Sequence, residues 1–97
     1  MKIFWTDTAI EHLSAIYIYI GQNSSQYAQR IVDRITRRSQ QISQFPFSGR
    51  IAPEFDNKQI REVIEGAYRI IYYIKSEQID ILAVIHGSQL VEQCDED

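Results

Sequence analysis

Two segments in the first half of the chain place apolar residues at helical spacing. Residues 7–21 carry one apolar stripe, and residues 26–44 carry a second stripe with charged side chains opposite it. A short connection that contains Gly21 joins the segments, so the pattern predicts an antiparallel two-helix hairpin. Thr6 or Thr8 begins the first helix, and Thr8 with Glu11 matches a capping box. The stripes consist of Ala9, Leu13, Ile16, Tyr17 and Ile20, and of Ala28, Ile31, Ile35 and Ile42.

Further apolar residues of the first helix fall outside its stripe. These are Ile10, Ile18 and Tyr19, and a single core-facing side of the helix does not need them. We therefore expect a second surface of this helix to be covered, either by a protein partner or by another copy of the chain.

The last third of the chain alternates apolar and polar residues, which is typical of strands. The alternation predicts strands at residues 60–65, 68–75 and 79–86, separated by turns short enough to force antiparallel neighbours. Residues 2–5 are predicted to join an edge of the same sheet.

Residues 45–59 interrupt both patterns. Pro46 and Pro53 oppose a continued helix and Gly49 permits a turn, so this segment is predicted to be a loop. The predicted fold class is therefore α+β: a small antiparallel β-sheet packed on one face by an antiparallel two-helix hairpin, in the order β-α-α-β-β-β.

Strict alternation also assigns the strand residues to the two faces of the sheet. The face expected beneath the helices is uniformly apolar, whereas the opposite face is mixed and is predicted to form a binding groove with a charged rim. The first face takes Tyr68, Ile70, Tyr72, Ile74, Ile79, Ile81, Ala83 and Ile85. The groove face takes Arg69, Ile71, Tyr73, Leu82, Val84 and His86.

The length of 97 residues predicts a single domain over residues 1–97, in which about 90–97 form a frayed acidic tail. The formal net charge is −3, so no direct sequence-specific nucleic-acid binding is expected. A local basic strip on the second helix is either a solvated face or a target-binding strip. It consists of Arg34, Arg37 and Arg38.

The sequence offers little evidence for a metal site, a disulfide or a membrane-spanning segment. Cys94 is the only cysteine, which rules out an internal disulfide and a cysteine-based zinc site and fits a reducing cytoplasm. His12 and His86 have no neighbouring ligand set, and no run of about 18 apolar residues is present. We expect a cytoplasmic protein with no metal, no cofactor and no membrane contact.

Several short motifs, in order along nearly the whole chain, carry a resemblance to a known family. They are Trp5-Thr6-x-x-Ala9, Phe45-Pro46-x-x-Gly49-Arg50, Arg61-Glu62, Tyr68-Arg69-Ile70-Ile71-Tyr72 and Ile81-Leu82-Ala83-Val84-Ile85-His86. With the order of elements, they resemble the RelE/ParE superfamily of bacterial type II toxins, and most closely its ParE branch of plasmid stabilisation proteins. The resemblance implies a toxin that a cognate antitoxin neutralises. It also implies inhibition of DNA gyrase by protein contact, without a catalytic site of its own.

The RelE branch, whose members cleave messenger RNA in the ribosome, implies an alternative. RelE-like nucleases resemble this chain in an arginine at the position of Arg69, and a nuclease would use Arg69, His86 and Arg61. Neither an arginine nor a tyrosine follows His86, and the acidic tail would repel RNA. A non-toxic binding module of the same fold is a further alternative.

Arg69 has two interpretations of its own. It forms an internal ion pair with Glu62 or Asp80, or it presents its planar guanidinium to an antitoxin segment in the groove. We favour recognition, with Ile10, Ile18 and Tyr19 as a second part of the antitoxin footprint or as a dimer contact. A homodimer, or a heterotetramer with the antitoxin, is compatible with this interpretation.

Overall fold

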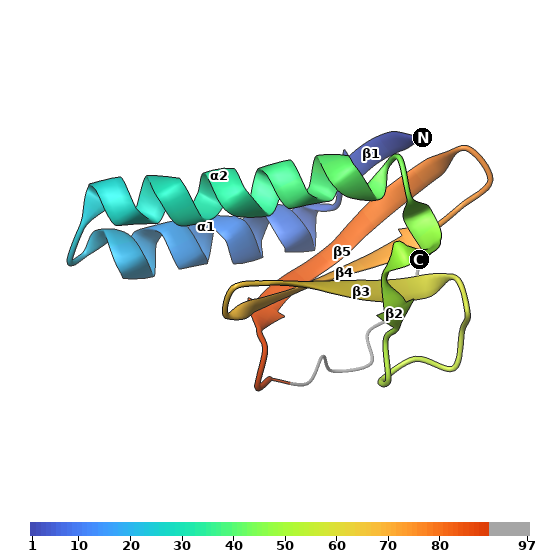
Figure 1. The fold of residues 1–97 in the computed structure, drawn as a ribbon. Helices are drawn as coiled ribbons and strands as arrows, with labels where there is room; N and C mark the ends of the chain where they lie inside the picture. Colours follow the sequence, from blue (N-terminus) through green and yellow to red (C-terminus); the bar gives the residue numbers. More distant parts are fainter. Residues whose placement is uncertain (90–97) are drawn as a thin grey trace.

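The computed structural model describes residues 1–89 and shows a helix hairpin lying across one face of a twisted sheet (Figure 1). The predicted frayed tail, residues 90–97, lies outside the described residues. No helix within residues 1–89 is long and apolar enough to cross a membrane. The elements in chain order are β1 (Lys2–Trp5), α1 (Asp7–Gly21), α2 (Ser25–Ile42), η1 (Pro46–Ser48), β2 (Arg50–Ile51), β3 (Ile60–Glu65), β4 (Tyr68–Ile74) and β5 (Gln78–His86).

Both helices begin at a capping hydroxyl. The Oγ1 atom of Thr6 accepts a hydrogen bond from the Ala9 amide at 3.2 Å, and Oγ of Ser24 accepts one from the Tyr27 amide at 3.1 Å. The predicted hairpin is confirmed, but the capping box at Thr8 is not, because Thr6 is the cap. The Thr6 hydroxyl also donates to the carbonyl of Ile81 at 2.7 Å, and this bond ties the start of α1 to β5.

The sheet described within residues 1–89 has five strands in the order β1-β5-β4-β3-β2. The predicted meander of β3, β4 and β5 is confirmed, and β1 joins an edge as expected. β1 pairs with β5 in parallel, however, so the sheet is mixed rather than antiparallel throughout. The short strand β2, which pairs with β3, lies inside the segment predicted to be a loop.

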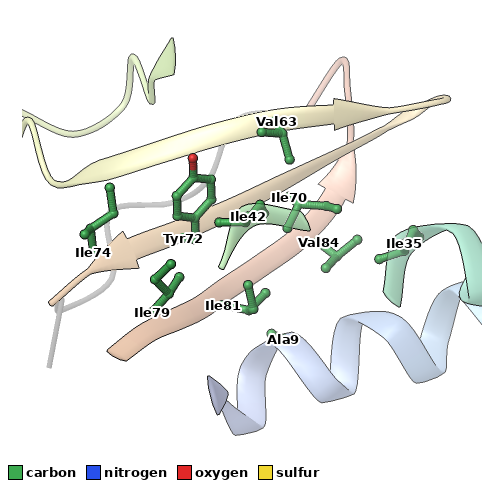
Figure 2. Packing of buried hydrophobic residues seen from close by; sticks show 10 residues of the cluster. All are labelled: Ala9, Ile35, Ile42, Val63, Ile70, Tyr72, Ile74, Ile79, Ile81 and Val84. Atoms are coloured by element: carbon green, nitrogen blue, oxygen red, sulfur yellow. The ribbon is translucent and has the colours of Figure 1, made fainter. Parts of the chain in front are cut away.

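The main core lies between the helix hairpin and the sheet (Figure 2). Tyr72 belongs to this core, and its hydroxyl donates to the Pro46 carbonyl at 2.6 Å and accepts from the Gly49 amide at 3.2 Å. The Phe-Pro-x-x-Gly-Arg loop is thereby fastened to the core. The buried cluster consists of Ala9, Ile35, Ile42, Val63, Ile70, Tyr72, Ile74, Ile79, Ile81 and Val84.

A β-bulge in β5 corrects the predicted division of the sheet into faces. Ile71 is opposite Ala83 and Tyr72 is opposite Ile81, so Leu82 is an extra residue in β5 that has no partner in β4. One inserted residue reverses the alternation beyond it. Val84 therefore packs into the core beneath the helices, although it was predicted on the groove face, and Ala83 packs on the opposite side.

The predicted groove face is largely covered by the chain itself. Ala52 and Phe55, from the segment between β2 and β3, pack on Ile71 and Ala83 in a second buried cluster. This segment is thus a cover over the second face of the sheet, and an open groove centred on Ile71 is wrong.

Candidate protein-binding groove

Arg69 lies in an internal ionic network instead of at an open surface. Its residue is only 3 % exposed, and each of its five N–H groups has an acceptor among the described residues. Nε donates to Glu62 at 2.8 Å, Nη2 donates to Glu54 at 2.6 Å and again to Glu62, and Nη1 donates to Glu54 and to the Gln89 carbonyl, both at 2.7 Å. The hydrogen bonds to Glu54, followed by those to Glu62, raise the pKa of Arg69 more than burial lowers it.

The ion-pair interpretation of Arg69 is therefore confirmed for Glu62. Asp80, the other predicted partner, accepts instead from Lys75 at 2.7 Å and from Gln78 at 2.6 Å. With every N–H group engaged inside residues 1–89, the guanidinium can bind an antitoxin carboxylate only by giving up one of these bonds.

The residues of the nuclease alternative do not form a common site. Arg69 lies on the face covered by residues 52–59, the same face as Ile71 two residues later in β4. There it donates to Glu62 of β3. Arg61 lies on the other face, with its guanidinium 5.0 Å from the centre of the Phe47 ring. The bulge also turns His86 toward the helix side, where its ring meets that of Tyr68 edge to face at 6.0 Å.

A cavity of about 620 Å³ lies between α1 and the ends of β4 and β5. Its volume is in the range of ligand and peptide pockets, and its walls combine apolar surface with histidine and tyrosine side chains. We call this cavity the α1–β5 groove. It is lined by His12, Ala15, Ile16, Tyr19, Tyr68, Val84, Ile85, His86, Ser88 and Gln89.

The outer edge of β5 borders this groove. β1 pairs with β5 only along Gln78–Ile81, so the later residues of β5 have no strand beyond them in the described sheet. The amide of Val84 donates to Nδ1 of His12 at 3.2 Å, and the amide of His86 donates to the Gln89 side chain at 3.1 Å. Side chains thus accept hydrogen bonds from backbone N–H groups that would otherwise be free to pair with a neighbouring strand. Covering these groups is one way of protecting a sheet edge.

Tyr68 separates the α1–β5 groove from a smaller hollow of about 240 Å³ on the α2 side. Burial raises the pKa of the Tyr68 phenol, and the nearby phenols of Tyr27 and Tyr19 act in the same direction. Tyr19 and Tyr68 line the groove, and Tyr27 and Tyr68 line the smaller hollow, so three tyrosines gather at this end of the hairpin. Tyrosines of this kind, rigid and partly exposed, are frequent energetic centres of protein interfaces.

The predicted site residues are divided by the structure. Tyr19, Val84 and His86 come together in the groove. Ile71, Tyr73 and Leu82 lie with Arg69 on the covered face, where Ile71 is fully buried and the other two are half-buried. Ile10 and Ile18 are exposed on α1 outside the groove lining, at 48 % and 65 %.

Sequence reasoning predicted Tyr19, Val84 and His86 and missed the other groove residues, which are His12, Ala15, Ile16, Tyr68, Ile85, Ser88 and Gln89. His12, Ile16 and Tyr19 are four and three positions apart, which places them in one row along α1. Because Tyr19 was already noted as an apolar residue outside the core stripe, this spacing could have identified His12 and Ile16 as its neighbours on the same side of the helix. Tyr68 follows the predicted alternation and was assigned to the core.

The basic strip on α2 is present as predicted, and Arg34, Arg37 and Arg38 line a shallow hollow of about 260 Å³ together with Gln41 and Glu65. Arg50, which follows the motif glycine, donates from Nε to Glu62. Within residues 1–89, histidines and carboxylates form no cluster that could hold a metal ion.

A family model described as the ParE toxin of the parDE type II toxin-antitoxin system matches residues 3–91. The chain belongs to the ParE toxin family. It is therefore a toxin of ParE type from a type II toxin-antitoxin system, as the motifs had indicated.

Relatives of this ParE-family toxin support the assignment. It is 32 % identical over 90 residues to Toxin RelE2 of Caulobacter vibrioides, which covers 92 % of the chain and 98 % of that relative. It is 31 % identical over 88 residues to the putative toxin Y4kP of Sinorhizobium fredii, covering 91 % and 90 %. A solved structure titled "Chromosomal ParDE TA system from P. aeruginosa" matches with a TM-score of 0.73 at 24 % identity, over 89 % of this chain and 95 % of that one, and so supports the fold.

Proposed function

We propose that this ParE-family toxin inhibits DNA gyrase by protein–protein contact and that a cognate antitoxin neutralises it by occupying the α1–β5 groove. Membership of the ParE family supports a gyrase target, because the resemblance to that branch implies one. The observation that carries the antitoxin site is the groove of about 620 Å³ with its tyrosine and histidine walls. A gyrase target also implies a cytoplasmic location.

The groove suits a peptide segment. Ile16 and Val84 offer apolar wall, while Tyr19, Tyr68 and His86 offer polar tips beside aromatic rings. An extended antitoxin segment could also pair with the outer edge of β5 beyond Ile81, where β1 does not reach, by displacing the side chains of His12 and Gln89 from the backbone amides of Val84 and His86. Side-chain pockets and a strand edge together are the features that bind extended peptides in other complexes.

The arrangement of charges favours inhibition by contact over RNA cleavage. Cleavage would need cationic stabilisation and a proton donor around one phosphate. Arg69 is held by Glu54 and Glu62, and both Arg61 and His86 lie on the other face of the sheet. The nuclease alternative remains in the test because one relative carries the name RelE2.

The function is tested by adding the purified toxin to gyrase supercoiling reactions and, in parallel, to translating ribosomes whose messenger RNA is mapped for cleavage. We expect supercoiling to stop and the messenger to stay intact. Cleavage with normal supercoiling would replace the proposal by the nuclease alternative. Silence in both assays, with no growth arrest on expression, would indicate a non-toxic binding module.

Antitoxin binding is tested separately, with the protein encoded by the neighbouring gene. We expect the antitoxin to restore supercoiling at a stoichiometric ratio and to form a complex whose mass, measured by light scattering, distinguishes a heterodimer from a heterotetramer. An antitoxin that binds without restoring supercoiling would contradict the proposal that it neutralises the toxin.

A further inference from the structure

A positively charged surface lies on the α2 flank of the molecule, away from the α1–β5 groove. Arg34, Arg37 and Arg38 of α2 line one hollow, and Arg61 of β3 lies on the side of the sheet that faces the helices, where α2 contacts both β3 and η1. We call Arg34, Arg37, Arg38 and Arg61 the arginine surface.

The arginines of this surface have few internal partners. Arg34, Arg37 and Arg38 form no ion pair within residues 1–89, and Arg38 donates only to the neutral side chain of Gln41, at 3.2 Å. Glu65 contributes a carboxylate to the hollow, so three positive charges there face one negative charge. Arginines without carboxylate partners keep their donors available for an external anion.

An exposed aromatic ring borders the arginine surface. Phe47 of η1 is 56 % exposed, and the guanidinium of Arg61 stacks on it at 5.0 Å. Arg61 is itself held in place, because Nε donates to the Lys58 carbonyl at 2.8 Å and Nη1 to the Gly49 carbonyl at 3.1 Å. Phe45, which directly precedes η1, is 66 % exposed. The fold thus holds an aromatic face beside fixed cations instead of burying it.

We infer that the arginine surface binds a single-stranded segment of nucleic acid, with phosphates on the arginines and an unstacked base on Phe47. Guanidinium groups next to an accessible aromatic ring are the pairing used by proteins that bind single strands without sequence preference. An acidic protein segment would engage the arginines but would gain nothing specific from Phe47. Because the whole chain carries a net charge of −3, the binding is local, weak and independent of sequence.

This inference is independent of the antitoxin site. The arginine surface belongs to α2 and β3, with Phe47 of η1 beside it, whereas the groove is lined by α1, β4, β5 and the residues just after β5. A toxin bound to a protein target that carries nucleic acid could therefore touch both components.

The test is fluorescence anisotropy of the purified full-length chain with labelled oligothymidylate and oligouridylate of ~12 nucleotides, at several salt concentrations. We expect dissociation constants of ~10–100 µM at low salt, and a slope of log K against log salt of about −3 for four phosphate contacts on a single strand. Tighter binding of one oligonucleotide distinguishes DNA from RNA as the preferred source of the strand. No binding of either at low salt would overturn the inference.

Two variants of equal net charge distinguish binding by the arginine surface from general electrostatic attraction to the protein. Arg37→Ala/Arg38→Ala should weaken binding ~10-fold and roughly halve the salt slope. Lys2→Ala/Lys75→Ala changes the net charge by the same two units at residues outside the surface, on β1 and just after β4, and should leave affinity within about 2-fold. Equal losses in both variants would show non-specific attraction and overturn the inference.

Phe47→Ala tests the base platform. It should weaken oligonucleotide binding about 5-fold or more with the salt slope unchanged, because stacking involves no charge. Polyglutamate of matched length should compete poorly. If polyglutamate displaces the oligonucleotide at equal charge concentration and Phe47→Ala binds like the parent, the occupant is an acidic protein segment and the inference fails.

Discussion

The guanidinium of Arg69 and the carboxylate of Glu62 face each other from β4 and β3 in the buried layer beneath residues 52–59, with Nε 2.8 Å from Oε1. Glu54, which belongs to the covering segment, accepts hydrogen bonds from Nη1 and Nη2 of the same guanidinium. The bonds between Arg69 and Glu54 therefore fix the cover to the sheet, and removal of the Arg69 side chain should affect stability more than recognition.

Arg69→Ala should lower the free energy of unfolding by ~3–5 kcal/mol, the usual cost of leaving buried charges without a partner. Urea denaturation followed by circular dichroism gives the value. Lys75→Ala removes an ion pair whose lysine is half exposed and whose Asp80 keeps its bond from Gln78, so this control should cost only a small fraction of that loss. An Arg69→Ala protein as stable as the parent, but weaker in antitoxin binding, would restore the recognition interpretation.

Gly49 should tolerate no side chain. A Cβ at this position would lie 2.5 Å from both the Glu62 carbonyl oxygen and the Tyr72 hydroxyl, so either β3 or the bond from Tyr72 would have to move. Gly49→Ala should cost ~1–3 kcal/mol of stability, measured by urea denaturation, as overpacking of a dense interior does.

Gly21→Ala is the matched control for the substitution of Gly49. Its Cβ would meet the Cβ of Ala28 at 3.8 Å, an ordinary contact, at the last residue of α1. Alanine there should be neutral or stabilising by up to ~1 kcal/mol, since it restricts the unfolded chain. A Gly49→Ala variant that matches Gly21→Ala in stability would mean that the loop adjusts freely and that the motif glycine is not a packing requirement.

The elements with strong periodicity could be predicted from the sequence, because their patterns are local. The helix hairpin, β3 and β4 lie within a residue or two of the predicted bounds. The assignment of faces failed at one residue, Leu82, since a bulge depends on how two strands pair and leaves no trace in the composition. The residues of β5 after Leu82, including His86, therefore lie on the opposite face of the sheet from the one predicted.

The environment of Arg69 could be predicted only in part. Glu62 lies on the neighbouring strand and was predicted as a possible ion-pair partner of Arg69. Glu54 comes from a segment with no periodicity, whose path over the sheet is set by the burial of Ala52 and Phe55. For that reason a covered face was interpreted as an open groove.

Tyr72 should make stability depend on pH in the alkaline range. Burial raises the pKa of its phenol above the ordinary value near 10. The folded state then keeps the proton at pH values where the unfolded chain has lost it. The stabilisation is complete below about pH 10 and is lost as pH rises through the folded pKa.

Urea midpoints between pH 8 and pH 11 measure this dependence. The experiment uses a Lys75→Ala background, because the hydrogen bond from Lys75 to Asp80 raises the pKa of that lysine and gives a loss in the same direction. Tyr72→Phe should cost ~1–3 kcal/mol at pH 8, through its lost bonds to Pro46 and Gly49, and should show a flatter decline above pH 10. An equally steep decline in Tyr72→Phe would assign the alkaline loss to other groups.

Adjacent residues of α1 give the sharpest test of where the antitoxin binds. Tyr19 lines the α1–β5 groove, whereas Ile18 points away from it, and both are largely exposed, at 73 % and 65 %. Neither substitution by alanine should disturb the fold, so a difference between them reports the interface. Tyr19→Ala should weaken antitoxin binding at least ~10-fold, as loss of an aromatic anchor from a pocket does, while Ile18→Ala should stay within ~3-fold. Calorimetric titration with the antitoxin of the neighbouring gene measures both. A larger loss for Ile18→Ala would move the footprint to the outer side of α1, and the groove would then need another occupant.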